Sequence, residues 1–218
     1  TLKKMHPTSF LEISALNALN RPGPIAFIPQ FIARMHGEEK IEYVHPKAEA
    51  ILKESYGIIV YQEQVMLLTR ALAGFTRGES DTVRKAMGKK KADLLAKMEI
   101  KFLEGCKKED TLDEATAKDL WEKFKEFAKY AFNKSHAIAY SIVANQCAYI
   151  KAHFPAEFLA ASMSSNMNDT DQLAIFVDDA KTNFNIPIVA PDINESESLF
   201  TVKDGKIVYA LAAIKGVG

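Results

Sequence analysis

Residues 129–158 read KYAFNKSHAIAYSIVANQCAYIKAHFPAEF, and a long helical pattern follows an aromatic run within this stretch. We expect that helix from about Ser135 to Ala152, because no proline or glycine interrupts it before Pro155. Four polar residues gather at its start: Asn133, Lys134, Ser135 and His136. Such a group either caps a core helix or holds an anion.

Most of the remaining chain also carries helical patterns. Ser9 followed by Glu12 predicts a capping box, and Pro22 and Pro24 forbid continuation of that helix. We expect Ser80 or Asp81 to cap a later one. The other segments with helical periodicity are 10–19, 25–37, 45–57, 58–75, 79–90, 91–108, 115–132, 155–166 and 170–184.

Residues 199–211 have a different character, since two β-rich runs, LFTV and IVYAL, flank KDGK. Asp204-Gly205 between such runs predicts a hairpin turn. The predicted fold is therefore mainly α, with several helices and a small β-hairpin near the C-terminus.

Composition narrows the class of protein. Apolar residues make up 48% of the 218, and 28 basic residues balance 28 acidic ones, so local charge has to carry any binding of an anion. Cys106 and Cys147 lack zinc-ligand spacing, which predicts a reducing, cytoplasmic setting. No apolar run approaches the roughly 20 residues of a membrane helix. The first residue is not Met and the last segment ends in a glycine pair, so we expect a fragment of a longer protein.

A basic cluster lies in VRKAMGKKK, where Lys and Arg donors suit phosphate oxygens. The alternative is a solvated basic turn at a helix C-terminus, which the helix dipole favours. The cluster contains Arg84, Lys85, Lys89, Lys90 and Lys91.

The polar group at the start of the 135–152 helix has two interpretations of equal weight. A helix N-terminus offers free N–H groups to an anion, and Lys134 and His136 would strengthen such a site. Alternatively, Asn133 and Ser135 only cap the helix, and the other two side chains are solvated.

The acidic pairs do not predict a metal site. Asp169 and Asp171 stand where a helix needs a cap, and Asp178 and Asp179 are neighbours that do not share a helix face. Arg21, in NRPGP, stands at the edge of a rigid turn.

The motifs taken in order resemble a known family. RPGP, YGIIVYQEQVM, RKAMGKKK, FNKSHA, AYIKAHFPAEF, PDIN and AIKGVG are similar to the fingers region of the bacterial replicative (C-family) DNA polymerase, the DNA polymerase III alpha subunit. The resemblance covers essentially the whole chain. That family often has glycines beside the tyrosine before FNKSHA, whereas Lys129 and Ala131 flank Tyr130 here.

The resemblance implies a domain order and a set of partners. Residues 1–24 would form a palm–fingers junction, 25–190 a helical fingers domain, and 191–218 the hairpin with the start of a truncated helix-hairpin-helix region. Mg²⁺ would be bound by palm aspartates outside this chain, which alone would be inactive. The expected partners are dNTP, DNA primer-template and, through the full-length protein, replisome subunits such as the sliding clamp.

The resemblance also implies site residues. The residues that match the phosphate-facing motifs are Arg84, Lys85, Lys89, Lys90, Asn133, Lys134, Ser135 and His136, and Arg21 matches the palm–fingers corner. Two alternatives stay open: a non-catalytic helical DNA-binding or replisome scaffold module, and an error-prone paralogue of the same polymerase.

Overall fold

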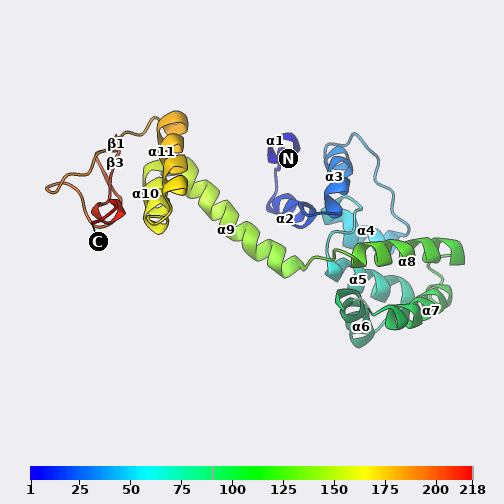
Figure 1. Ribbon diagram of the computed structural model, residues 1–218. Helices are drawn as coiled ribbons and strands as arrows, with labels where there is room; N and C mark the ends of the chain where they lie inside the picture. The colour runs from blue at the N-terminus through cyan, green and yellow to red at the C-terminus, as the bar shows by residue number, and fades with distance from the viewer. Residues whose placement is uncertain (90, 218) are drawn as a thin grey trace. The chain divides into compact units, whose positions relative to one another are not determined.

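The structure is a computed structural model that describes residues 1–89 and 91–217. The chain divides into two compact units, Thr1–Ser141 and Ile142–Gly218. Helices dominate both, and a small sheet lies in the second unit (Figure 1). The predicted fold class is confirmed.

The first unit opens with short helices. They are α1 (Leu2–Met5), α2 (Phe10–Leu19), a 3-10 helix (Pro24–Phe27), α3 (Ile28–Met35), α4 (Pro46–Leu52) and a second 3-10 helix (Lys53–Ser55). The predicted capping box is confirmed, since the Ser9 N–H donates to the Glu12 carboxylate at 3.0 Å and the Glu12 N–H donates to Ser9 Oγ at 3.4 Å. The Glu12 carboxylate also accepts a 2.6 Å bond from the Tyr56 hydroxyl and is 5% exposed, so it joins α2 to the end of the second 3-10 helix.

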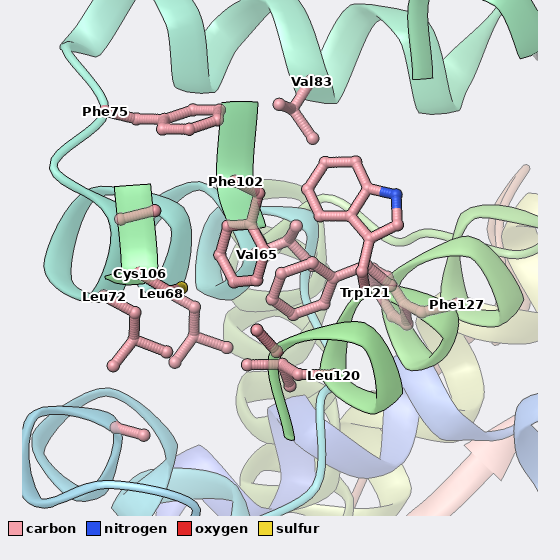
Figure 2. Packing of buried hydrophobic residues seen from close by; sticks show 14 of the residues in the cluster. Val65, Leu68, Leu72, Phe75, Val83, Phe102, Cys106, Leu120, Trp121 and Phe127 are labelled. Carbon is pink, nitrogen blue, oxygen red and sulfur yellow. The ribbon is translucent and has the colours of Figure 1, made fainter. Parts of the chain in front are cut away.

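Four longer helices build the main core of this unit: α5 (Gln62–Ala73), α6 (Arg77–Gly88), α7 (Ala92–Lys108) and α8 (Glu114–Ala128). The ring of Phe102 lies 5.1 Å from that of Trp121, centroid to centroid (Figure 2). The ring of Phe124 lies 5.6 Å from that of Phe102. All three side chains are buried, as periodicity predicted for Phe102 on α7 and for the aromatic face of α8.

Helices α5 and α7 approach closely at Gly105. A Cβ atom at this glycine would overlap the carbonyl oxygen of Ala73 and lie 2.8 Å from its Cβ atom. The glycine is therefore required by the distance between two helix backbones, although its own backbone conformation is available to any residue.

Two predicted helix starts were wrong. Helix α6 begins at Arg77, because Thr76 and Glu79 form a capping box, with the Thr76 N–H donating to the Glu79 carboxylate at 2.8 Å; Ser80 lies buried inside the helix. Residues 58–60 belong to no helix or strand, and Tyr61 has an extended backbone and forms a parallel bridge with Phe132.

Helix α9 (Lys134–His153) begins in the first unit, and its residues from Ile142 belong to the second. The second unit continues with α10 (Pro155–Ser165) and α11 (Thr170–Phe184). Its sheet consists of β1 (Ile188–Val189), β2 (Thr201–Lys203) and β3 (Lys206–Val208) in the order β1-β3-β2.

The predicted hairpin is confirmed in this sheet. Strands β2 and β3 pair antiparallel, and Asp204 and Gly205 have φ values of 49° and 72°, as a type I′ turn requires. Strand β1, which pairs parallel to β3, was not predicted, because two residues give no pattern. Asp169 caps α11 through a 3.0 Å bond from the Gln172 N–H, and Lys151 pairs with Asp179 at 2.6 Å, so these carboxylates have structural partners.

Candidate functional site

The start of α9 is capped by Asn133 and not by Ser135. The His136 N–H donates to Asn133 Oδ1 at 2.8 Å, and the Ala137 N–H donates to the Asn133 carbonyl oxygen at 3.1 Å. Ser135 lies inside the first turn, so its hydroxyl is not used as the cap. The side chains of Ser135 and His136 are exposed.

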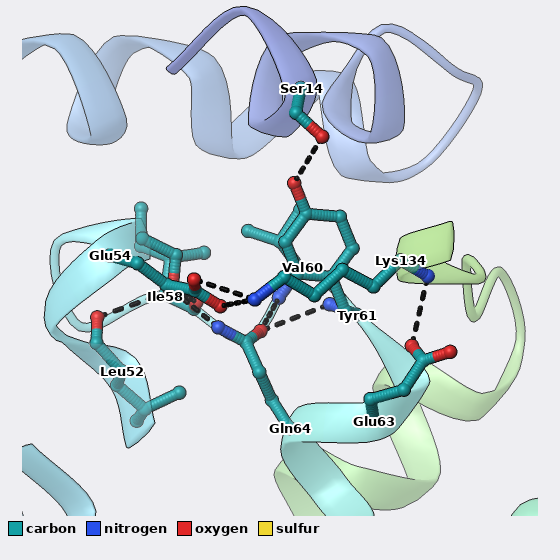
Figure 3. A network of polar contacts seen from close by, with 10 residues as sticks. Ser14, Leu52, Glu54, Ile58, Val60, Tyr61, Glu63, Gln64 and Lys134 are labelled. Carbon is teal, nitrogen blue, oxygen red and sulfur yellow. Dashed lines mark hydrogen bonds and ion pairs between the residues drawn. The ribbon is translucent and has the colours of Figure 1, made fainter. Parts of the chain in front are cut away.

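A carboxylate from α5 lies against this helix start. Glu63 accepts a 2.9 Å hydrogen bond from the Lys134 backbone N–H (Figure 3). It also accepts a 2.6 Å bond from Asn133 Nδ2. Beside it, the Gln62 N–H donates to the Phe132 carbonyl oxygen at 2.9 Å. The start of α5 is therefore hydrogen-bonded to three consecutive residues at the start of α9: Phe132, Asn133 and Lys134.

The ammonium group of Lys134 is also paired. Both oxygens of Glu54 lie 2.6 Å from Lys134 Nζ, and the two side chains are 25% and 30% exposed, respectively. The same ammonium lies 5.7 Å from the centroid of the Tyr61 ring. This cation, which the motif assigned to a phosphate, is thus neutralised by a carboxylate of its own chain.

A buried polar network surrounds the start of α5 (Figure 3). Gln64, 1% exposed, accepts hydrogen bonds from the backbone N–H groups of Val60 (2.8 Å) and Tyr61 (3.0 Å), and it donates to Ser55 Oγ at 2.8 Å. The Tyr61 hydroxyl donates to Ser14 at 3.1 Å, and burial raises the pKa of Tyr61 to about 12, so this phenol stays neutral. These hydrogen bonds fix the backbone beside Glu63 and Glu54, the two acids that bind Asn133 and Lys134.

The NRPGP corner lies against the same segment. Gly23 has a φ of 100°, and a Cβ atom there would lie 3.0 Å from the Tyr130 ring, so only glycine fits without strain. The Arg21 guanidinium lies 5.1 Å from the centroid of Phe132, whose ring lies 5.5 Å from that of His136. The structure thus places the Arg21 guanidinium and the His136 ring beside the same aromatic ring, that of Phe132. Lys129, where the family often has glycine, has an ordinary φ of −64°.

The basic cluster at the end of α6 contains its own counter-charge. Asp81 accepts from Arg84 Nε and Nη2 at 2.8 and 2.7 Å, and from Lys85 Nζ at 2.8 Å. The Lys85 ammonium and the Arg84 guanidinium hold the pKa of Asp81 below its usual value. Lys89 follows the last turn and is exposed; the predicted Lys90 lies outside the described residues.

The two predicted clusters are not joined in the part of the chain that the structure describes, where no hydrogen bond or ion pair links residues 84–89 to residues 133–136. A cavity of about 370 Å³ in the first unit is lined by Tyr43, Phe127 and Tyr130 among others, and its lining does not include either cluster.

Sequence reasoning missed the two acidic partners. Neither Glu63 nor Glu54 was singled out as a site residue from the sequence. The available signal was charge complementarity between YQEQ and FNKSH, but neither motif indicates that they meet.

The described residues contain no group of three His, Cys, Asp or Glu side chains placed to hold a metal ion. Among the described helices, none is both long enough and apolar enough to cross a membrane.

Comparison with known proteins gives two family matches and several close relatives. Residues 1–110 match the model of the bacterial DNA polymerase III alpha subunit finger domain, and residues 185–218 match a helix-hairpin-helix motif. Over the whole chain, identity is 49% to the DNA polymerase III subunit alpha of Aquifex aeolicus, 46% to that of Caulobacter vibrioides and 43% to that of Bacillus subtilis.

The chain spans 19% of the length of each of these relatives. The finger-domain match covers just over half of the chain, and it includes the NRPGP corner, the start of α5 with Glu63 and the basic end of α6. This chain belongs to the family of bacterial DNA polymerase III alpha subunit finger domains.

Proposed function

We propose that this chain is the fingers part of a DNA-directed DNA polymerase, a nucleotidyltransferase, and that it binds the phosphates of the incoming dNTP beside the primer-template. The observation that carries the proposal is the meeting of Arg21 with the start of α9 through Phe132. Family membership supports it, because a finger domain belongs to a polymerase. It also disfavours the alternative of a non-catalytic helical scaffold.

The start of α9 carries side chains that are able to donate hydrogen bonds to phosphate oxygens. Ser135 and His136 are exposed in the first turn, and the Arg21 guanidinium lies within the same aromatic cluster. Asn133 and Lys134 also belong to the proposed site, although their polar groups already have partners in the chain. In this arrangement Ser135 and His136 would bind phosphate oxygens, whereas Asn133 and Lys134 would hold the helix start in place.

The end of α6 supplies a second group of cations, Arg84, Lys85 and Lys89. Lys90 of the same motif, which lies outside the described residues, is included in the proposal from its place in the sequence. The Asp81 pairs are partly exposed, with Arg84 34% and Lys85 61% exposed, so each contributes little stability. A triphosphate carries more charge than one carboxylate and offers geometry that suits arginine. These cations are therefore able to exchange Asp81 for phosphate at small cost.

The chemistry assigned to this chain is binding and orientation. Nucleotidyl transfer depends on positioning and on cations that stabilise charge on the phosphates, and these residues supply both. Mg²⁺ would be held by palm carboxylates outside this chain and would stabilise the charge on the transferred phosphate. The cytoplasmic setting, the division at residues 24 and 190, and sliding-clamp contacts of the full-length protein belong to the same proposal.

The helix-hairpin-helix match favours DNA contact by the C-terminal segment. Residues 185–218 contain β1 to β3 and a 3-10 helix (Leu211–Ala213), followed by Gly216 with a φ of 87°. A glycine turn of this kind exposes backbone N–H groups that suit a DNA phosphate. We assign this segment to the primer-template backbone and not to the nucleotide.

The test is single-nucleotide incorporation by the full-length polymerase subunit that carries this chain. We expect Arg84→Ala to raise the KM for dNTP about ten-fold, since a charge-assisted hydrogen bond to phosphate is lost. Lys123→Ala is the matched control, because Lys123 on α8 also pairs with an acid one turn earlier, Asp119, at 2.7 Å. If the KM of Arg84→Ala equals that of the wild type, as we expect for Lys123→Ala, Arg84 does not belong to the nucleotide site.

A further inference from the structure

The first turn of α9 is almost closed to an external anion. Of its four leading N–H groups, that of Lys134 donates to Glu63, and those of His136 and Ala137 donate to Asn133. Of these four groups, the Ser135 N–H is the one for which the described residues provide no acceptor. The positive end of the helix dipole is therefore occupied by a carboxylate from another helix.

Each oxygen of the Glu63 carboxylate accepts a separate hydrogen bond at the helix start. One of its oxygens accepts from the Asn133 side chain at 2.6 Å and the other from the Lys134 N–H at 2.9 Å. The Asn133 amide is consequently fixed at both ends, because its oxygen caps His136 while its nitrogen binds Glu63. Loss of the carboxylate would free the cap residue as well as the first helical residue.

A second acid defines the direction of the Lys134 side chain. Glu54 binds Lys134 Nζ through both oxygens, and it comes from the 3-10 helix that follows α4. The two acids approach the same residue from different elements, one at its backbone and one at its ammonium. Lys134 is thus held in place at both ends of the residue.

We propose that Glu63 is a positioning residue for nucleotide binding: it fixes the first turn of α9 so that the Ser135 and His136 side chains meet the phosphates of the incoming nucleotide. Glu54 assists by holding Lys134, which then serves the framework and not the phosphate. This inference rests on the proposed function, because it needs the helix start to face the nucleotide.

The physical reason is geometric. Recognition of a phosphate group by side chains depends on their placement, and a misplacement of about 1 Å can cost up to roughly 100-fold in activity. The first turn of a helix frays unless its N–H groups have acceptors. An internal carboxylate removes this fraying before the nucleotide binds, and the site is preorganised.

The experiment uses the full-length polymerase subunit with Glu63→Gln, which keeps the size of the side chain. A glutamine has one acceptor oxygen, so either Asn133 Nδ2 or the Lys134 N–H loses its acceptor. Glu114→Gln is the matched control, since Glu114 is also a first-turn acid, on α8, and pairs with Lys118.

We expect Glu63→Gln to raise the KM for dNTP about ten-fold, while kcat, the Kd for primer-template and the melting temperature change little. The effect of His136→Ala on the KM should be smaller in the Glu63→Gln background than alone, because both changes act on the same helix start. The control should leave all four quantities unchanged.

Two results would overturn the role of Glu63. The first is an unchanged KM in Glu63→Gln. The second is a joint loss of nucleotide binding, DNA binding and melting temperature, which would mean that Glu63 only holds the fold. If Ser135→Ala and His136→Ala also leave the KM unchanged, the helix start leaves the proposed nucleotide site altogether, and the role of Glu63 falls with it.

Discussion

Replacement of Gly105 by alanine tests whether α5 and α7 are in contact at their backbones. In an isolated helix this change stabilises, because alanine exceeds glycine in helix propensity by about 1 kcal/mol. Here the added methyl would overlap the Ala73 carbonyl oxygen and lie 2.8 Å from the Ala73 Cβ atom. Both obstacles are backbone or directly attached to it, so no side-chain rotation removes them.

The magnitude follows from two opposed terms. Overpacking a well-packed contact costs about 1–3 kcal/mol, and a contact with backbone lies at the upper end of that range. After the propensity gain is subtracted, Gly105→Ala should lower the free energy of unfolding by about 1–2 kcal/mol. For a domain of this size that corresponds to a melting temperature lower by about 2–8 °C.

The assay is urea unfolding followed by tryptophan fluorescence. Trp121 is the only tryptophan in the sequence, is fully buried, and lies beside Phe102 on α7, so its emission reports the core of the first unit. Gly78→Ala on α6 is the control, because a Cβ atom there meets nothing within 4 Å, and its stability should stay equal or rise. Stability of Gly105→Ala equal to or above wild type would refute the backbone contact.

Two further changes test other parts of the first unit. Burial raises the pKa of Glu12, but hydrogen bonds from Tyr56, Thr8 and Ser9 together lower it by more, so the pKa in the folded state lies below the ordinary value of 4.5. Glu12 therefore stabilises the folded state above pH 4.5, and this stabilisation is lost as the pH falls through the folded pKa. The stability difference between wild type and Glu12→Gln, measured by urea unfolding, should therefore shrink from about pH 6 to pH 3, and a constant difference would contradict this. Thr76→Ala should lower the free energy of unfolding by about 1 kcal/mol by removing the cap of α6, and an unchanged unfolding midpoint would show that Glu79 alone maintains the helix start.

Local patterns in the sequence predicted local structure well. The capping box at Ser9, the buried face of α8 and the Asp204-Gly205 turn each depend on residues within a few positions of one another. The same local logic explains the error at α6, where Thr76 and Glu79 form a better capping box than Ser80 or Asp81 could provide. The pairing of Asp81 with Arg84 and Lys85 was equally local and could have been read from the spacing.

The part of the candidate site that could not be predicted depends on contacts between distant segments. Glu63 and Asn133 are 70 residues apart, and Glu54 and Lys134 are 80 apart. Charge complementarity is common among such residues, so it does not select this pairing among many. Gly23 shows the same limit, because only the structure shows the Tyr130 ring that excludes a side chain there.

The bond between Glu63 and Asn133 also has a consequence for the order of folding. The bond closes a loop of 70 residues. The entropic cost of closing so long a loop is offset only after α5 to α8 have packed. At a synthesis rate of about 5–20 residues per second, Glu63 emerges from the ribosome roughly 4–14 seconds before its partner. We therefore expect the helix start that we assign to the nucleotide to be among the last parts of the first unit to form.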